Sequence, residues 1–294
     1  MLNGILVVDK PTDWTSFDVV AKLRGVLNTR KIGHSGTLDP MATGVLPLFV
    51  GLSARAVDMQ KNNTKRYTAA VKFGQSTDTG DITGTTLCKS DKLITAAELC
   101  EALPHFLGRQ QQIPPMYSAV KVNGQPLYKL ARKGIEIDRK PREIQIFEIN
   151  FLGGGNNEYV LDVLCSKGTY IRTLLQDIGE RLQCPAVMTA LRRTQNGDYN
   201  IKNAYTLEEI YAAKEKGELQ KLLLSVDTVF ADLPKITATP AQEKRLHNGA
   251  GFTLCAPDGE YRVYREQNEE FLGVAAVQNG ECRVKKLFTE NPYA

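Results

Sequence analysis

Residues 31–44, KIGHSGTLDPMATG, place one histidine and one aspartate among glycines and turn-forming residues. An aspartate before a proline is most often structural, because its side chain accepts hydrogen bonds from nearby backbone amides. Here the glycines would let the backbone approach a ligand closely, and the apolar residues 45–50 would anchor the loop. Asp39 could therefore act as a covalent nucleophile or a general base. His34 alone is as readily a loop histidine bonded to backbone.

Several other catalytic motifs are missing from the sequence. It contains no GxxxxGK[ST] or GxGxxG phosphate loop, no HExxH and no GxSxG. The six cysteines include no CxxC pair, and with only three histidines no structural zinc pattern can be written. A nucleotide-driven, zinc-driven or serine-hydrolase mechanism is therefore disfavoured, and free thiols are expected.

The elements that must position the loop follow from the spacing of apolar residues. Residues 15–27 have a helical apolar face, with Ser16 as a plausible N-cap. Residues 66–73 alternate as a strand does, which places Tyr67 on the same face as three apolar side chains. Further predictions are strands over residues 144–149 and 159–165 and helices over residues 95–108, 169–182 and 206–224.

The length of 294 residues favours two domains. Beyond Asp232, short β-like runs alternate with glycine, asparagine and aspartate turns, which is typical of a small all-β unit. We therefore expect one domain over residues 1–230 and a second over residues 231–294. No apolar run reaches the length of a membrane span, and the first residues lack the features of a signal peptide. A cytoplasmic location is expected.

Charge is distributed unevenly along the chain. The net charge is +4, and residues 121–142 hold seven bases against two acids, a local charge of +5. Residues 232–294 hold eight bases against nine acids, a local charge of −1. The basic segment fits an RNA partner and fits equally well a solvated, lysine-rich helix face.

Taken together, short blocks in the first 195 or so residues resemble the TruB-type pseudouridine synthases. The sequence GHSGTLDP of residues 33–40, with GVLP of residues 44–47, is similar to the signature loop of that family. The other blocks come in the family's order: DKP at 9–11 with Ser16, KRY at 65–67, FGQSTDT at 73–79, IPPMYSAVKVNG at 113–124, RKPR at 139–142, CSKGTYIRTL at 165–174 and LRR at 191–193.

The resemblance implies both a fold and an activity. The fold would be α+β, with a mixed, largely antiparallel catalytic sheet and an RNA-gripping insertion at about residues 110–142. A small PUA-like RNA-binding domain would follow. The activity would be isomerisation of uridine 55 in the T-loop of tRNA to pseudouridine, with the target base flipped out of its stack. No metal or other cofactor would be needed, and we expect the chain to act on tRNA as a monomer.

The resemblance also assigns roles to individual residues. Asp39 takes the place of the essential aspartate, which attacks either the base at C6 or the ribose at C1′. Tyr67 matches the residue that stacks on the flipped base, and Arg172 matches the arginine that pairs with the aspartate. His34 matches a residue that contacts RNA near the position that the base leaves. Tyr170 and Leu191 match residues that line the pocket. In the insertion, the basic candidates for RNA contact are Lys129, Arg132 and Lys133.

Three alternatives remain open from the sequence. The chain could be a non-catalytic module that binds or folds RNA, although the presence of Asp39, Tyr67 and Arg172 speaks against this reading. It could be the catalytic subunit of a guide-RNA-dependent pseudouridine synthase. An aspartate glycosidase is disfavoured because no second carboxylate has a matched context.

Overall fold

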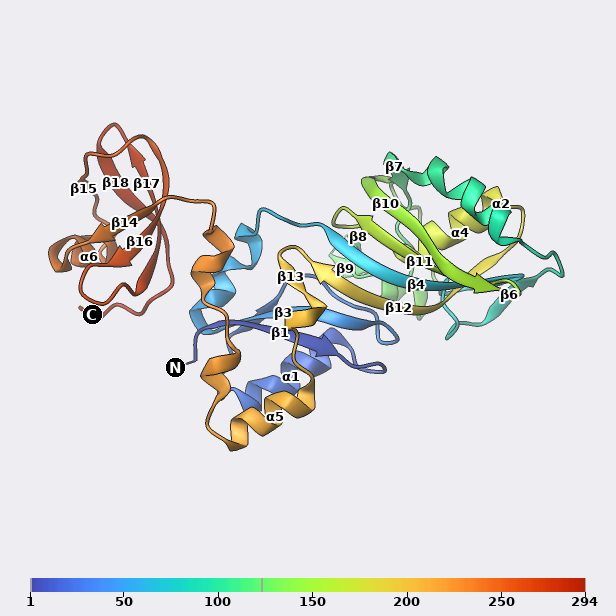
Figure 1. Cartoon of the computed structure of the whole chain (residues 1–294), viewed down its shortest axis with the longest axis horizontal. Helices are drawn as coiled ribbons and strands as arrows, with labels where there is room; N and C mark the ends of the chain where they lie inside the picture. Colours follow the sequence, from blue (N-terminus) through green and yellow to red (C-terminus); the bar gives the residue numbers. More distant parts are fainter. Residues whose placement is uncertain (1, 123, 294) are drawn as a thin grey trace.

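The computed structural model describes residues 2–122 and 124–293 and shows an α+β fold built around two separate large sheets (Figure 1). The larger sheet has nine strands, most of them paired antiparallel, which confirms the predicted fold class. Its main path runs in the order β1 (Gly4–Lys10), β3 (Thr43–Val50), β12 (Ala186–Asn196), β4 (Lys65–Phe73), β11 (Glu158–Cys165), β10 (Arg142–Gly155) and β7 (Gly108–Gln112). Two short strands complete it, with β2 (Ile32–His34) paired to β3 and β13 (Tyr199–Asn200) paired to β12.

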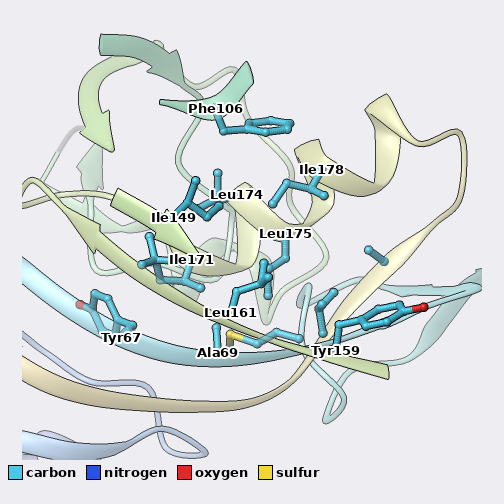
Figure 2. Packing of buried hydrophobic residues seen from close by; sticks show 14 of the residues in the cluster. Tyr67, Ala69, Phe106, Ile149, Tyr159, Leu161, Ile171, Leu174, Leu175 and Ile178 are labelled. Carbon is cyan, nitrogen blue, oxygen red and sulfur yellow. The ribbon is translucent and has the colours of Figure 1, made fainter. Parts of the chain in front are cut away.

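Helices cover the two ends of this sheet separately (Figure 1). One hydrophobic cluster packs α1 (Ser16–Val26) and α5 (Leu207–Glu215) against β1 and β3. Another packs α4 (Ile171–Arg181) and α2 (Ala96–Ala102) against β4, β10 and β11, and Figure 2 shows Tyr67 at one end of this second cluster. Residues 35–42, which connect β2 to β3 and include Asp39, are called the active loop here. This loop lies beside β12, the strand that joins the part of the sheet covered by α1 and α5 to the part covered by α2 and α4.

The strand β12 is the long inner strand that sequence periodicity did not predict. It lies between β3 and β4, pairing parallel with the first and antiparallel with the second. Its second half is polar, including Arg192, Arg193 and Asn196. An apolar run or a clean alternation is the usual signature of an inner strand, so the polar side chains concealed it. Of these side chains, Arg193 and Asn196 donate hydrogen bonds to the carbonyl oxygens of Gly36 and Ser35, in the loop that carries Asp39.

Three predicted helix boundaries are wrong. The helix predicted over residues 95–108 ends at Ala102 in α2 and is followed by a 3-10 helix, η2 (Leu103–Phe106), before β7 begins. The N-cap of α1 is Thr15, whose side chain forms a capping box with Asp18, whereas Ser16 is the first helical residue and is buried. The helix predicted over residues 206–224 ends at Glu215 in α5, because Gly217 adopts a left-handed φ of +71° there. A short 3-10 helix, η4 (Leu219–Leu222), follows instead.

The basic insertion folds as a hairpin followed by a short helix. The strands β8 (Lys121–Val122) and β9 (Gln125–Pro126) pair through Val122 and Gln125, and α3 (Leu127–Ala131) follows directly. The sequence predicts this turn at Asn123 and Gly124, of which Asn123 lies outside the described residues. The hairpin is tied to the preceding segment, since Tyr128 donates a backbone hydrogen bond to Ser118.

The smaller sheet has five strands. This unit also contains one helix, α6 (Pro240–His247), which the predicted all-β unit does not include. Its order is β14 (Lys235–Ala238), β16 (Gly259–Arg265), β17 (Phe271–Gln278), β18 (Glu281–Leu287) and β15 (Phe252–Thr253). Phe271 stacks on both Phe230 and Phe288, in a cluster that also contains Ile5 of the large sheet. The two sheets are therefore joined by a shared apolar core.

Among the described residues, none of the helices is long and apolar enough to cross a membrane.

Candidate active site

A cavity of about 250 Å³ lies beside Asp39 at the junction of five segments that are separate in the sequence. The active loop supplies one wall and β4 another. The insertion, the start of α4 and Leu191 of β12 supply the rest of the lining. The residues that line it are 36–39 of the loop, Lys65 and Tyr67 of β4, Ser118 and Ala119 of the insertion, residues 168–172 and Leu191.

Asp39 and Arg172 form an ion pair in this cavity. Arg172 Nε lies 3.0 Å from Asp39 Oδ2, and the side chain of Arg172 is only 5% exposed whereas that of Asp39 is 36% exposed. The two terminal nitrogens of the guanidinium donate to the carbonyl oxygens of Thr79 and Tyr117, each at 2.8 Å. Each of the three guanidinium nitrogens therefore has a partner. These contacts fix the plane of the guanidinium and hold Oδ2 of Asp39 beside Nε.

Opposing effects act on the carboxyl group of Asp39. Burial raises its pKa above the ordinary value, and Arg172 opposes that rise while the nearby Asp81 adds to it. Lys10 also favours the charged form of Asp39. Burial lowers the pKa of Lys10 itself to about 8. The cavity therefore combines an incompletely hydrated carboxylate with a fixed counter-charge, an arrangement suited to a nucleophile or base.

Buried polar side chains hold the backbone of the active loop from several directions. Ser16 Oγ accepts a hydrogen bond from the amide of Leu38 at 2.9 Å and donates to its carbonyl oxygen at 3.3 Å. Arg193 is fully buried and donates to the carbonyl oxygens of Val45 and Gly36. Lys10 Nζ donates to that of Pro40 at 3.1 Å. This scaffold positions Asp39 before any ligand arrives.

Five of the predicted site residues meet at the cavity. They are Asp39, Tyr67, Tyr170, Arg172 and Leu191. Tyr67 is buried, and burial raises the pKa of its hydroxyl to about 12, so the ring stays neutral. A neutral aromatic ring on a rigid strand suits stacking against a base.

The other predicted residues lie outside the cavity wall. His34 is half-buried on β2, and its Nδ1 has no hydrogen-bond partner among the described residues. Burial lowers the pKa of its imidazole. Lys129, Arg132 and Lys133 are all exposed on the insertion. The guanidinium of Arg132 lies 5.6 Å from the centre of the Tyr128 ring.

Sequence reasoning missed the residues that hold the loop. The sequence predicts Ser16 as a helix cap and as part of a family motif, and Lys10 and Arg193 only as parts of such motifs. The one available signal was the pair Arg192-Arg193, because alternation along a strand turns one of two neighbouring side chains inward. In the structure Arg192 is half-buried and pairs with Asp9, whereas Arg193 is completely buried.

No group of three or more histidine, cysteine, aspartate or glutamate side chains is placed to hold a metal ion in the part of the chain that the structure describes.

Three family models together match most of the chain, between residues 24 and 288. Residues 24–171 match the TruB family pseudouridylate synthase N-terminal domain, and residues 172–231 match the tRNA pseudouridylate synthase B C-terminal domain. Residues 234–288 match a further C-terminal domain described as that of pseudouridine synthase II TruB.

Whole-chain relatives agree with these matches. The tRNA pseudouridine synthase B of Shewanella sp. (strain ANA-3) is 39% identical over 97% of this chain and 94% of its own. That of Lactobacillus acidophilus is 41% identical over 86% of this chain and 88% of its own. Among solved structures, a chain of a Cbf5-Nop10-Gar1 complex has a TM-score of 0.72 at 23% identity, covering 99% of this chain and 87% of that one, which shows a shared fold. The chain therefore belongs to the TruB family of pseudouridylate synthases.

Proposed function

We propose that the chain isomerises uridine 55 in the T-loop of tRNA to pseudouridine, with Asp39 as its nucleophile. The observation that carries this proposal is the ion pair between Asp39 and Arg172 in a cavity that also presents the ring of Tyr67. Relatives at 36–41% identity over most of the chain are tRNA pseudouridine synthases B, which supports tRNA as the substrate.

The geometry suits an isomerisation that begins at the carboxylate. A uridine flipped out of its stack would enter the cavity and lie against Tyr67. The carboxylate of Asp39 would then attack ribose C1′ or base C6, so that the base detaches, rotates and rejoins the ribose through C5. The proton at C5 is lost, and N1 of the rotated ring gains one. Arg172 keeps Asp39 charged and oriented before the attack, and stabilises the carboxylate again when the bond to the substrate breaks.

The test is the release of tritium from C5-labelled uridine in a T-loop transcript. We expect release by the wild type and none by Asp39→Asn, which keeps the shape of the side chain but removes its charge. Asp91→Asn serves as the control, because Asp91 is exposed on the surface away from the cavity. Equal release by wild type and Asp39→Asn, or none by the wild type, would reject the proposal and favour a non-catalytic RNA-binding module.

A guide-RNA-dependent role is the second candidate, because the Cbf5 chain has the same fold. The purified chain distinguishes the two, since a stand-alone synthase needs neither a guide RNA nor partner proteins. We expect full turnover of a T-loop transcript by the chain alone.

The surrounding surface supports an RNA substrate. We assign Lys129, Arg132 and Lys133 to contacts with phosphates of the T-stem-loop, since all three are exposed on the insertion whose Ser118 and Ala119 line the cavity. His34 would contact RNA beside the space that the base leaves. We assign residues 1–230 to the catalytic domain and residues 231–294 to a PUA-like domain with local RNA contacts. The chain would act as a monomer in the cytoplasm.

A further inference from the structure

Lys65 lines the cavity, and its ammonium group is not paired with any of the groups that hold Asp39 or the active loop. Four cationic side chains surround the active loop, and three of them are occupied by the protein itself. Arg172 binds Asp39 and two carbonyl groups, Arg193 binds the carbonyl oxygens of the loop, and Lys10 binds those of Pro11, Trp14 and Pro40. Within residues 2–122 and 124–293, Lys65 Nζ has neither a hydrogen-bond acceptor nor a carboxylate partner.

The position of Lys65 directs its charge toward the substrate. It lines the cavity beside Tyr67, and on strand β4 these two residues lie on the same face because side chains alternate. Its ammonium also lies against the active loop, since a Cβ atom built on Gly36 would be 3.1 Å from Lys65 Nζ and 3.7 Å from a terminal nitrogen of Arg193. A base stacked on Tyr67 would therefore have its edge near this ammonium.

We propose that the Lys65 ammonium contacts the uracil ring in the cavity and stabilises the negative charge that the ring acquires during the reaction. This inference rests on the proposed function. If Asp39 attacks C1′, the electron pair of the C1′–N1 bond stays on the ring, spread over N1, O2 and O4. If Asp39 attacks C6, the charge moves to C5 and O4. In both paths the ring becomes an anion beside a cation that holds no other partner.

The remaining steps leave Lys65 chemically unchanged. In both paths the C1′–N1 bond is broken before ring C5 forms its bond to C1′, and the bond between Asp39 and the substrate then breaks, returning its electron pair to the carboxylate. The C5 proton then leaves, and N1 takes a proton from solvent. A fixed charge inside a cavity stabilises a developing anion more strongly than water does, because it needs no reorganisation at the moment of reaction.

The decisive experiment compares Lys65→Gln and Lys65→Arg with the wild type, measuring the single-turnover rate at saturating T-loop RNA and the Kd separately. We expect Lys65→Gln to lower the rate about 10²- to 10³-fold, with little change in Kd, and Lys65→Arg to keep most of the rate. Lys72→Gln is the matched control, because Lys72 lies on the same strand but outside the cavity lining, and its half-exposed side chain is paired with Glu158. A weakened Kd with an unchanged rate would assign Lys65 to a phosphate instead and would overturn the proposal.

Two further measurements exclude a merely structural role. Burial and the nearby Arg193 lower the pKa of Lys65 to about 8, so the wild-type rate should fall as pH rises through this value. Lys65→Arg should move that fall to higher pH. With 5-fluorouridine as the target the ring has no C5 proton to lose, so the rate measured there is that of C1′–N1 bond cleavage. The defect of Lys65→Gln in this step should be smaller than with uridine, because fluorine stabilises the ring anion itself.

The outcomes separate this inference from the proposed function. A wild type that forms no pseudouridine rejects the function as a whole. A wild type that is active, with a Lys65→Gln variant that is folded and equally fast, rejects only the role of Lys65. An equal defect of Lys65→Gln on uridine and 5-fluorouridine would also reject it.

Discussion

The reactivity of Asp39 depends on one neighbouring residue. Burial raises the pKa of its carboxyl group, whereas Arg172, 3.0 Å away, opposes the rise. The carboxylate must be ionised to attack, so activity is lost as pH falls through this pKa. Arg172 therefore sets how far into the acidic range the site can work.

Replacing Arg172 should move the acidic limb of the pH–rate profile. In Arg172→Gln the pKa of Asp39 is no longer held down, so we expect the loss of activity to begin about 1–3 pH units higher than in the wild type. Arg172→Lys keeps the charge but cannot contact Asp39, Thr79 and Tyr117 at once, so the acidic limb of its pH–rate profile should shift less. Single-turnover rates measured across the acidic range would show this, and coincident limbs for all three proteins would contradict it.

At the scale of the element, the active loop depends on side chains that hold only backbone groups. Ser16 binds both the amide and the carbonyl of Leu38, the residue before Asp39. The neighbouring Thr15 instead caps α1 through Asp18. Two adjacent hydroxyl groups thus have separate functions, one for the position of the loop and one for the stability of the helix.

This separation can be tested with two alanine variants. Ser16→Ala removes both hydrogen bonds to Leu38 and should lower the single-turnover rate about 10- to 100-fold by misplacing Asp39. Thr15→Ala should leave the rate unchanged and lower the free energy of unfolding by about 1 kcal/mol, the usual cost of a lost cap. Urea unfolding and rate measurements on both variants would check this. A slower Thr15→Ala, or a fully active Ser16→Ala, would be inconsistent with the assignment.

The insertion should contribute to affinity through charge. Reversing Lys129, Arg132 and Lys133 to glutamate should weaken tRNA binding and flatten its dependence on salt, by a slope of roughly two to three, because fewer counterions are released from the RNA. The matched control reverses three other exposed lysines on the α5 side of the molecule, Lys202, Lys214 and Lys216. Binding titrations over a range of salt concentrations would measure this, and an unchanged slope would remove the assignment.

At the scale of the whole molecule, the two large sheets share an apolar joint. Phe288 is 1% exposed and stacks on Phe271 with ring centres 5.8 Å apart, and both rings lie near Phe230. The same cluster includes Ile5 and Ala56 from the other side of the joint. The C-terminal unit therefore completes a core that also belongs to the large sheet.

Truncating one aromatic ring at this joint should destabilise the whole chain. Phe288→Ala leaves a cavity among buried aromatic rings and should lower the free energy of unfolding by about 3–5 kcal/mol. Phe147→Ala, at an exposed position on β10, should change it by less than about 0.5 kcal/mol. Denaturant unfolding followed by two probes, one reporting on each sheet, would measure both. A transition in the C-terminal unit alone would show that the joint contributes little.

The residues proposed to carry the reaction could be predicted from the sequence, but the residues that hold the active loop in place could not. Asp39 in a glycine-rich loop is a local pattern, and the family resemblance added Tyr67 and Arg172 as its partners. Ser16 and Arg193 leave no such pattern, because they bind backbone groups that every residue carries. The strand β12 brings Arg193 to the loop by pairing with strands that are distant in the sequence, and local periodicity carries no record of such pairing.

The hydrogen bond from Arg172 to the carbonyl of Tyr117 has a consequence for fidelity. Tyr117 precedes the hairpin of the insertion, so the guanidinium that orients Asp39 also rests on the segment that we propose holds the RNA. An RNA that displaces this segment would break the hydrogen bond from Arg172 to Tyr117, so that Arg172 would no longer hold the carboxylate of Asp39 in the orientation needed for attack. We expect incorrect RNAs to be rejected because they react slowly after binding, so that selectivity appears in the rate of the chemical step more than in affinity.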